Sequence, residues 1–220
     1  MSKMVLIIGV IIIMIVGFCV YYFGNKQKIT RVLNELPETS IKNLRINEVY
    51  KTSGNVLILD KPLIAPLSGK ECVYYMLKVE QKTKSGKNDN WNVIGKDEQI
   101  QDFFIAQNED KVLIKPQLKP KEFESYVTIN LKEKVNISGN NSDRIESLIE
   151  KFNIKKTAFM GFSNQLRFSE ATIGIGEHIT VAGVVKSINL KEPIQDYSYS
   201  KIIALEHDDK QKLIITNMPK

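Results

Sequence analysis

The feature that most constrains this chain is a run of twenty uncharged residues near its N-terminus, from Met4 to Phe23. At ~1.5 Å of rise per residue, a helix of this length reaches ~30 Å, about the hydrocarbon thickness of a bilayer. The run contains six Ile, four Val, one Leu and two Phe, which favour insertion into the membrane. It predicts a transmembrane helix over residues 4–23, preceded by a tail of residues 1–3, with Ile12 near its middle.

A cleaved signal peptide and a buried core helix are the alternatives to a retained anchor. A signal peptide has a shorter apolar core and ends in small residues, whereas this run ends in Tyr21, Tyr22 and Phe23, a pattern typical of an aromatic interface belt. The sequence therefore predicts a retained anchor, and a single-pass protein because no second apolar run follows. Three basic residues, Lys26, Lys28 and Arg31, follow the run, whereas Lys3 and the α-amino group precede it. The excess of one positive charge predicts that the C-terminal domain lies in the cytoplasm.

The charge pattern narrows the class of partner. The chain carries 31 Lys and Arg against 25 Asp and Glu, a formal charge of +6. The basic residues are interleaved with acidic ones, and no linear motif combines aromatic and Arg residues for stacking on bases. Nucleic acid is therefore not expected as a partner; the lipid bilayer and an unidentified protein or peptide are.

Cysteine and histidine are too few for a zinc site. The chain has two of each, Cys19, Cys72, His178 and His207; Cys19 lies in the predicted anchor and the others lack ligand spacing. Cys72 is interpreted as a small buried hydrophobe, with a nucleophile as the alternative. No GxSxG, P-loop or HExxH motif is present, so the sequence predicts no metal, no cofactor and no catalytic residue.

The rest of the chain is typical of a mainly β protein. Residues 24–39 are expected to form a juxtamembrane stem ended by Pro37, and residues 40–220 a small barrel- or sandwich-like β domain. The last two predicted strands are joined by a polar turn, residues 207–210, as a hairpin, and residues 82–90 are predicted to be an exposed hairpin loop. Short β-rich runs separated by turn residues predict strands at residues 55–59, 72–81, 91–94, 103–107, 111–114, 165–168, 178–189, 201–207 and 212–216.

One amphipathic helix interrupts the strands, at about Asp143 to Phe152. Its apolar residues Ile145, Leu148, Ile149 and Phe152 follow helical spacing. Ser142 is a suitable N-cap, and the apolar stripe is expected to face the core.

A collinear set of motifs resembles the GIDE domain, also called the beside-a-membrane (BAM) domain, of Mulan-type E3 ubiquitin ligases and their prokaryotic relatives. The proline-rich core is PLIAPLSGKECVYY, from Pro62 to Tyr75. The remaining counterparts of the family pattern are Trp91, Phe103, Phe104, Arg167, Phe168, Glu170, Gly176 and Glu177. The resemblance covers residues 40–187 and implies a domain held beside a membrane, here the plasma membrane of a prokaryote.

Two departures from that family bear on function. The ligases carry a second transmembrane helix and a C-terminal RING, and this chain has neither, so ligase activity is not implied. The resemblance instead suggests a non-catalytic interaction or ligand-sensing module; a ligase component that borrows a RING from a partner is the alternative. At residues 107–110, QNED stands where relatives have a glycine-containing turn, and the turn is expected to persist with altered geometry.

The candidate binding residues are those of the shared motifs, and each has a structural alternative. Trp91 is expected in the core, with ligand stacking as the alternative. Arg167 and Glu170 are expected either to bond a distant strand or to contact a ligand at an open sheet edge that could pair with a peptide. The full set is Pro66, Ser68, Gly69, Trp91, Arg167 and Glu170.

Overall fold

A computed structural model describes residues 24–85, 88–119, 121–155, 162–189, 201–209 and 211–218. No helix within these ranges is long and apolar enough to cross a bilayer. The predicted anchor, with Met4, Ile12 and Phe23, lies outside them.

Five strands close into a barrel. Strands β1 and β10 pair at both ends of the order β1-β5-β6-β11-β10, so the sheet has no free edge there. All neighbours are antiparallel except β6 and β11, which are parallel. The barrel strands are β1 (Val49–Ile58), β5 (Phe103–Gln107), β6 (Asp110–Ile114), β10 (His178–Asn189) and β11 (Lys201–Glu206).

The connectivity of this barrel is that of an OB-fold, a five-stranded Greek-key barrel. If the five strands are numbered by their order in the chain, their order around the barrel is first, second, third, fifth and fourth. The third and fifth strands are the parallel pair. Two long insertions interrupt it: residues 59–102 between β1 and β5, and residues 115–177 between β6 and β10. A fold of this kind supports many functions and does not itself indicate one. The two insertions distinguish this chain from a simple barrel, and a functional site is therefore sought in them.

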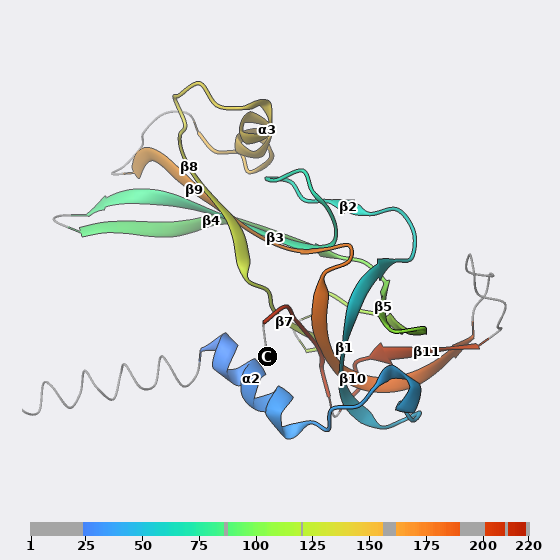
Figure 1. The fold of residues 1–220 in the computed structure, drawn as a ribbon. Coiled ribbons are helices and arrows are strands. Elements are labelled where there is room, and N and C mark those ends of the chain that lie inside the picture. The colour runs from blue at the N-terminus through green and yellow to red at the C-terminus, as the bar shows by residue number, and fades with distance from the viewer. Residues whose placement is uncertain are drawn as a thin grey trace, which may run out of the picture.

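The insertions build a second sheet beside the barrel (Figure 1). Strand β3 is central, with β9 along one edge and β2 and then β4 along the other, and β8 pairs the far side of β9. Helix α3 (Asp143–Lys151) covers one face. The strands are β2 (Leu63–Ile64), β3 (Glu71–Ser85), β4 (Asn88–Ile100), β8 (Ile129–Asn136) and β9 (Phe162–Gly174).

Barrel and second sheet share one hydrophobic core. Val73 and Tyr74 of β3 and Ala171 and Ile173 of β9 pack into the same cluster as the barrel interior. The outer halves of these strands instead pack against α3. The second sheet is therefore anchored at one end, and its β3–β4 hairpin extends beyond the barrel (Figure 1).

The predicted stem is part of the packed domain. Residues Asn25–Glu35 form helix α2, and a short 3₁₀ helix follows at Ile41–Asn43. Ile29 and Leu33 of α2 are buried on Ala182 of β10 and on a strand near the C-terminus, β12 (Leu213–Thr216). The helix forms because its apolar residues fall at i and i+4 on one face.

The expected hairpin at residues 207–210 is wrong. Strands β11 and β12 do not pair with each other; both run antiparallel to β10, one after the other along the same edge. Strand β12 also pairs with a parallel strand, β7 (Phe123–Tyr126). A polar segment between two strands has the same sequence signature whether it reverses the chain or bulges out of one edge.

Most of the other local predictions are confirmed. The bounds of β5 and β10 match the expected ranges, and the Ser142 side chain accepts a hydrogen bond from the Ile145 N–H at the start of α3. The predicted loop 82–90 is largely strand, since β3 and β4 continue to Ser85 and Asn88. The turn after β5 persists, with Asn108 at φ 57° in place of a glycine.

Candidate functional site

A proline-rich turn joins β2 to β3, and a buried carboxylate holds it. The Gly69 N–H donates to the Ala65 carbonyl at 2.8 Å, which closes the turn. From β9, the fully buried Glu170 carboxylate accepts the N–H groups of Leu67 at 2.7 Å and Ser68 at 3.1 Å. The Glu170 carboxylate thus accepts from backbone N–H groups that would otherwise lack an acceptor, and this gives it a structural role.

The turn brings together four of the six candidate residues: Pro66, Ser68, Gly69 and Glu170. Gly69 has φ +70°, a left-handed conformation, and a Cβ there would collide with the Arg144 guanidinium at the start of α3. Of the two alternatives for Glu170, the bond to a distant segment is the one observed. The Glu170 carboxylate lies on the α3 side of the sheet, where the turn between β2 and β3 encloses it.

Arg167 lies on the opposite face of the same sheet, because successive side chains of a strand alternate. Its Nε donates to the Glu80 carboxylate of β3 at 2.8 Å, and Lys78 Nζ lies 3.2 Å from the other oxygen. The hydrogen bond from Arg167 lowers the pKa of Glu80; burial opposes this shift and Lys78 adds to it. The same bond raises the pKa of Arg167.

Trp91 is part of this second group. The Arg167 guanidinium carbon lies 4.6 Å from the centre of the indole ring, and Lys134 Nζ of β8 lies 5.8 Å from it, both within the range of a cation–π interaction. The expectation that Trp91 is a core residue is wrong: its side chain is half-buried on the sheet surface. Two residues along β4, Val93 is 59% exposed.

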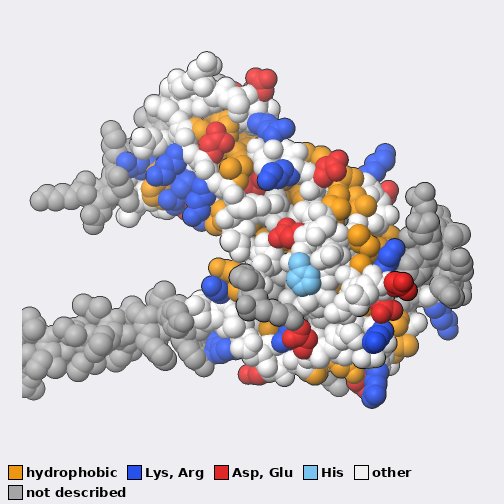
Figure 2. Space-filling view, in the orientation of Figure 1, with side chains coloured by type: hydrophobic (Ala, Val, Ile, Leu, Met, Phe, Trp, Pro, Cys, Tyr) orange, Lys and Arg blue, Asp and Glu red, His pale blue; other side chains and the backbone are white. Residues whose placement is uncertain are grey.

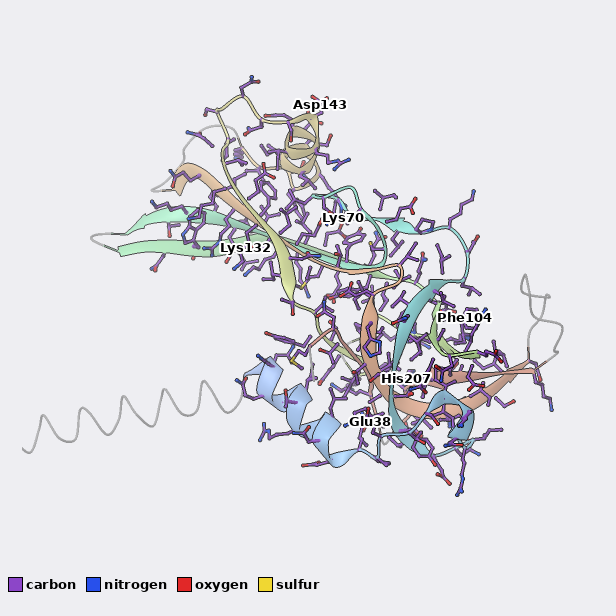
Figure 3. The ribbon with its side chains drawn as sticks, viewed as in Figure 1. Glu38, Lys70, Phe104, Lys132, Asp143 and His207 are labelled. Atoms are coloured by element: carbon purple, nitrogen blue, oxygen red, sulfur yellow. The ribbon has the colours of Figure 1, made fainter. Side chains whose placement is uncertain are left out.

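These residues belong to a larger surface, the basic face, which is the side of the second sheet opposite α3. Among the side chains that the structure describes, strand register and alternation place six basic and two acidic ones there, around Trp91 and Val93. Figure 2 shows Lys and Arg side chains gathered at this end of the sheet, and Figure 3 marks Lys132 on β8, away from Asp143 at the start of α3. The charged members are Lys78, Glu80, Lys82, Lys96, Glu98, Lys132, Lys134 and Arg167.

The inner end of the basic face borders a hollow of about 570 Å³ beside α2. A chain of hydrogen bonds links residues that line it. Asn25 Nδ2 of α2 donates to the Ser125 carbonyl at 3.2 Å, and the Ser125 hydroxyl lies 3.1 Å from the Tyr74 hydroxyl. The Tyr74 hydroxyl donates to Glu98 at 2.8 Å, and Lys96 bonds the other Glu98 oxygen at 2.6 Å.

Cys72 is fully buried in β3, and burial raises the pKa of its thiol to about 11. Its Sγ lies 3.6 Å from the Leu63 carbonyl. These observations agree with its interpretation as a small hydrophobic residue. Within the described ranges, no three His, Cys, Asp or Glu side chains are grouped as metal ligands.

No protein-family model, curated protein or solved structure matches this chain. Its function therefore has to be argued from its own residues.

Sequence reasoning missed Glu80 and Lys134, two members of the basic face. Glu80 contacts the predicted residue Arg167, and Lys134 contacts the predicted residue Trp91. Strand β3 alternates Leu77 and Val79 with charged neighbours, which signals one buried and one polar face. The contact of Trp91 with Arg167 and Lys134 has no linear motif, because its members come from β4, β9 and β8.

Proposed function

We propose that this chain is a single-pass, membrane-anchored, non-catalytic binding module of the GIDE/BAM type, whose basic face meets an anionic ligand or protein partner beside the membrane. The observation that carries the proposal is the placement of Trp91 against Arg167 and Lys134 on an exposed sheet face. An aromatic ring in contact with two cationic side chains offers a ligand both apolar contact and positive charge. The proposed location is the plasma membrane of a prokaryote, with the domain in the cytoplasm.

The paired groups of the second sheet support binding rather than catalysis. The Glu170 carboxylate is used by two backbone N–H groups, and Glu80 is held by Arg167 and Lys78. A general acid or base needs a group that can reach a substrate proton. No observation favours the alternative of a ligase component with a RING from its partner, and it is an outcome of the second test below.

The anchor is tested by replacing Ile12 with Arg in the full chain. A charge at the helix centre costs about 2.5–3.5 kcal/mol on insertion scales, so the variant should move from the membrane to the carbonate-soluble fraction. Lys201→Glu, on an exposed position of β11, is the control and should leave the chain in the membrane. Equal retention of the Ile12 variant and the unmodified chain would contradict the anchor.

Binding at the basic face is tested with a photo-crosslinking residue at Val93, in native membranes. A matched probe at Ile203, exposed on β11, measures nonspecific capture. The proposal expects an adduct at position 93 that is absent at 203 and is reduced by Lys132→Glu with Lys134→Glu. Equal adducts at both positions contradict it, and a zinc-containing ligase subunit in the adduct, identified by mass spectrometry and metal analysis, supports the alternative.

A further inference from the structure

We infer that the basic face docks onto the anionic lipid headgroups of the same bilayer that residues 4–23 are proposed to enter. The inference rests on the proposed function, because it takes the membrane anchor as given. It assigns a chemical class, the phosphate-bearing lipid headgroup, to the ligand of the basic face.

The position of the face relative to the chain entry is the first argument. The described chain begins at Gly24, and α2 starts at Asn25. Asn25 is joined to Lys96 of the basic face through Ser125, Tyr74 and Glu98. Asn25, the second residue after the proposed anchor, is thus connected to the inner end of this face by four hydrogen bonds.

The direction of the sheet is the second argument. Figure 1 shows that the β3–β4 hairpin extends to the same side of the molecule as the N-terminal end of α2. The Trp91 cluster lies toward the outer part of that hairpin, where Lys82 pairs with Trp91. A bilayer that receives the chain at Gly24 is therefore on the side toward which the basic face extends.

The composition of the face is the third argument. The two carboxylates that the structure describes on this face are paired, Glu80 with Arg167 and Lys78, and Glu98 with Lys96, so they oppose an anionic surface less than free carboxylates would. Lys132 and Lys134 are exposed on β8. Clustered Lys and Arg attract the negative cytoplasmic leaflet, and Trp is enriched where protein meets the headgroup region.

The apolar centre favours a lipid surface over a nucleic acid or an acidic peptide. Val93 is 59% exposed and lies two residues from Trp91 on the same face, and apolar side chains amid cations are typical of segments that lie in a membrane interface. The anchor would hold the face at a high effective concentration near the headgroups. The face would then contact the headgroups even if its affinity for them is too low to hold a domain without an anchor at the membrane.

Trp91 provides a specific reporter, because it is the single Trp of the chain. The full chain is placed in nanodiscs of phosphatidylcholine alone, or of equal phosphatidylcholine and phosphatidylglycerol, each with a fraction of brominated lipid as quencher. The inference expects about twofold or more quenching of Trp91, with a blue-shifted emission, only in the anionic discs. High salt should remove the difference, since it screens charges at an exposed surface.

Matched variants separate the face from total charge. Lys132→Glu with Lys134→Glu should abolish the difference between the two lipids. The same charge change on the barrel, Lys111→Glu with Lys201→Glu at two exposed positions, should preserve it. Loss of the difference in the barrel variant would mean that net charge, and not the basic face, is responsible, which overturns the inference.

The remaining outcomes distinguish the docking from the anchor. Equal quenching in the two lipids, with the chain retained in the discs, overturns the headgroup contact and leaves the proposed anchor intact. A chain that carbonate removes from both discs overturns the anchor and the inference together. A Trp91 response to a single-stranded oligonucleotide in neutral discs, without a response to anionic lipid, reassigns the face to nucleic acid.

Discussion

The Glu170 carboxylate accepts the N–H of Leu67 at 2.7 Å, across a separation of 103 residues. This bond joins the turn between β2 and β3 to the centre of the second sheet. Together with the pairing of Cys72 to Tyr75 of β3 with Thr172 to Gly174 of β9, it joins two motifs of the sequence, the proline-rich core and the segment that follows Arg167. Arg167 turns to the side of the sheet opposite α3, so Glu170 and Arg167 have separate roles.

Replacing Glu170 with Ala should destabilise the domain strongly. The Leu67 and Ser68 N–H groups would lose their acceptor, and each orphaned buried donor costs about 1–3 kcal/mol. A loss of about 2–4 kcal/mol corresponds to a fall in melting temperature of roughly 5–15 °C for a domain of this size. Thermal unfolding measures it, with exposed Glu133 of β8 replaced by Ala as the control. An unchanged melting temperature would argue that Glu170 is available to a ligand.

Replacing Arg167 with Gln should change the pH dependence of stability. Arg167 lowers the pKa of folded Glu80, so the stabilisation is fully present above the unfolded pKa of about 4.3 and is lost as the pH falls through the lower folded value. The difference in melting temperature between the unmodified chain and the variant should be largest above about pH 5 and shrink as the pH falls below the unfolded pKa of about 4.3.

The control for this titration is Lys134→Gln, because Lys134 also contacts Trp91 but is not a cause of the Glu80 shift. Its effect on melting should not vary in the same acidic range. The carboxyl resonance of Glu80, followed by NMR, gives a direct measurement. A Glu80 midpoint that is the same with and without Arg167 would contradict the assigned cause.

Gly69→Ala and Gly176→Ala should cost about the same. Both glycines have positive φ, +70° and +79°, and a side chain in this conformation costs about 1–2 kcal/mol. A Cβ at residue 69 would also meet the Arg144 guanidinium, but this group is the far end of a flexible side chain and can move aside, and nothing lies within 4 Å of a Cβ at residue 176. Denaturant unfolding of the two variants, repeated with Arg144→Ala, tests this expectation: removal of the Arg144 side chain should change the cost of Gly69→Ala little, and a large change would refute it.

Ile29→Ala should loosen helix α2 from the barrel. Ile29 is fully buried against Ala182 and Ile214, and truncation of a buried Ile costs about 2–4 kcal/mol. Hydrogen exchange of the α2 amides should accelerate roughly 10- to 100-fold or more, while exchange in β10 changes little. Exposed Thr30→Ala is the control. A fragment that begins at Gly24 should accordingly be more stable than one that begins at Ser40, and equal melting of the two fragments would count against α2 as part of the domain.

Local structure followed from the sequence wherever a short-range pattern carried it. A β-rich run over residues 178–189 predicted β10 with its observed bounds, and Ser142 before an apolar stripe predicted the start of α3. Strand β8 was missed although Leu131 and Val135 share the face that packs toward α3, because Lys132 and Lys134 occupy its other face. The two-residue strand β2 is too short for any periodic signal.

The sequence by itself determined a mainly β domain, its helix α3 and the buried character of Cys72, because β-rich runs bounded by turn residues, helical spacing and the alternating run after Cys72 are properties of neighbouring residues. Only the tertiary structure decided which strands close the barrel, and that β11 and β12 share the edge of β10. It also decided that Arg167 meets Glu80 and Trp91 while Glu170 meets Leu67. Strand register sets these partners, and register depends on packing and backbone pairing between segments far apart in the chain, which no local pattern encodes.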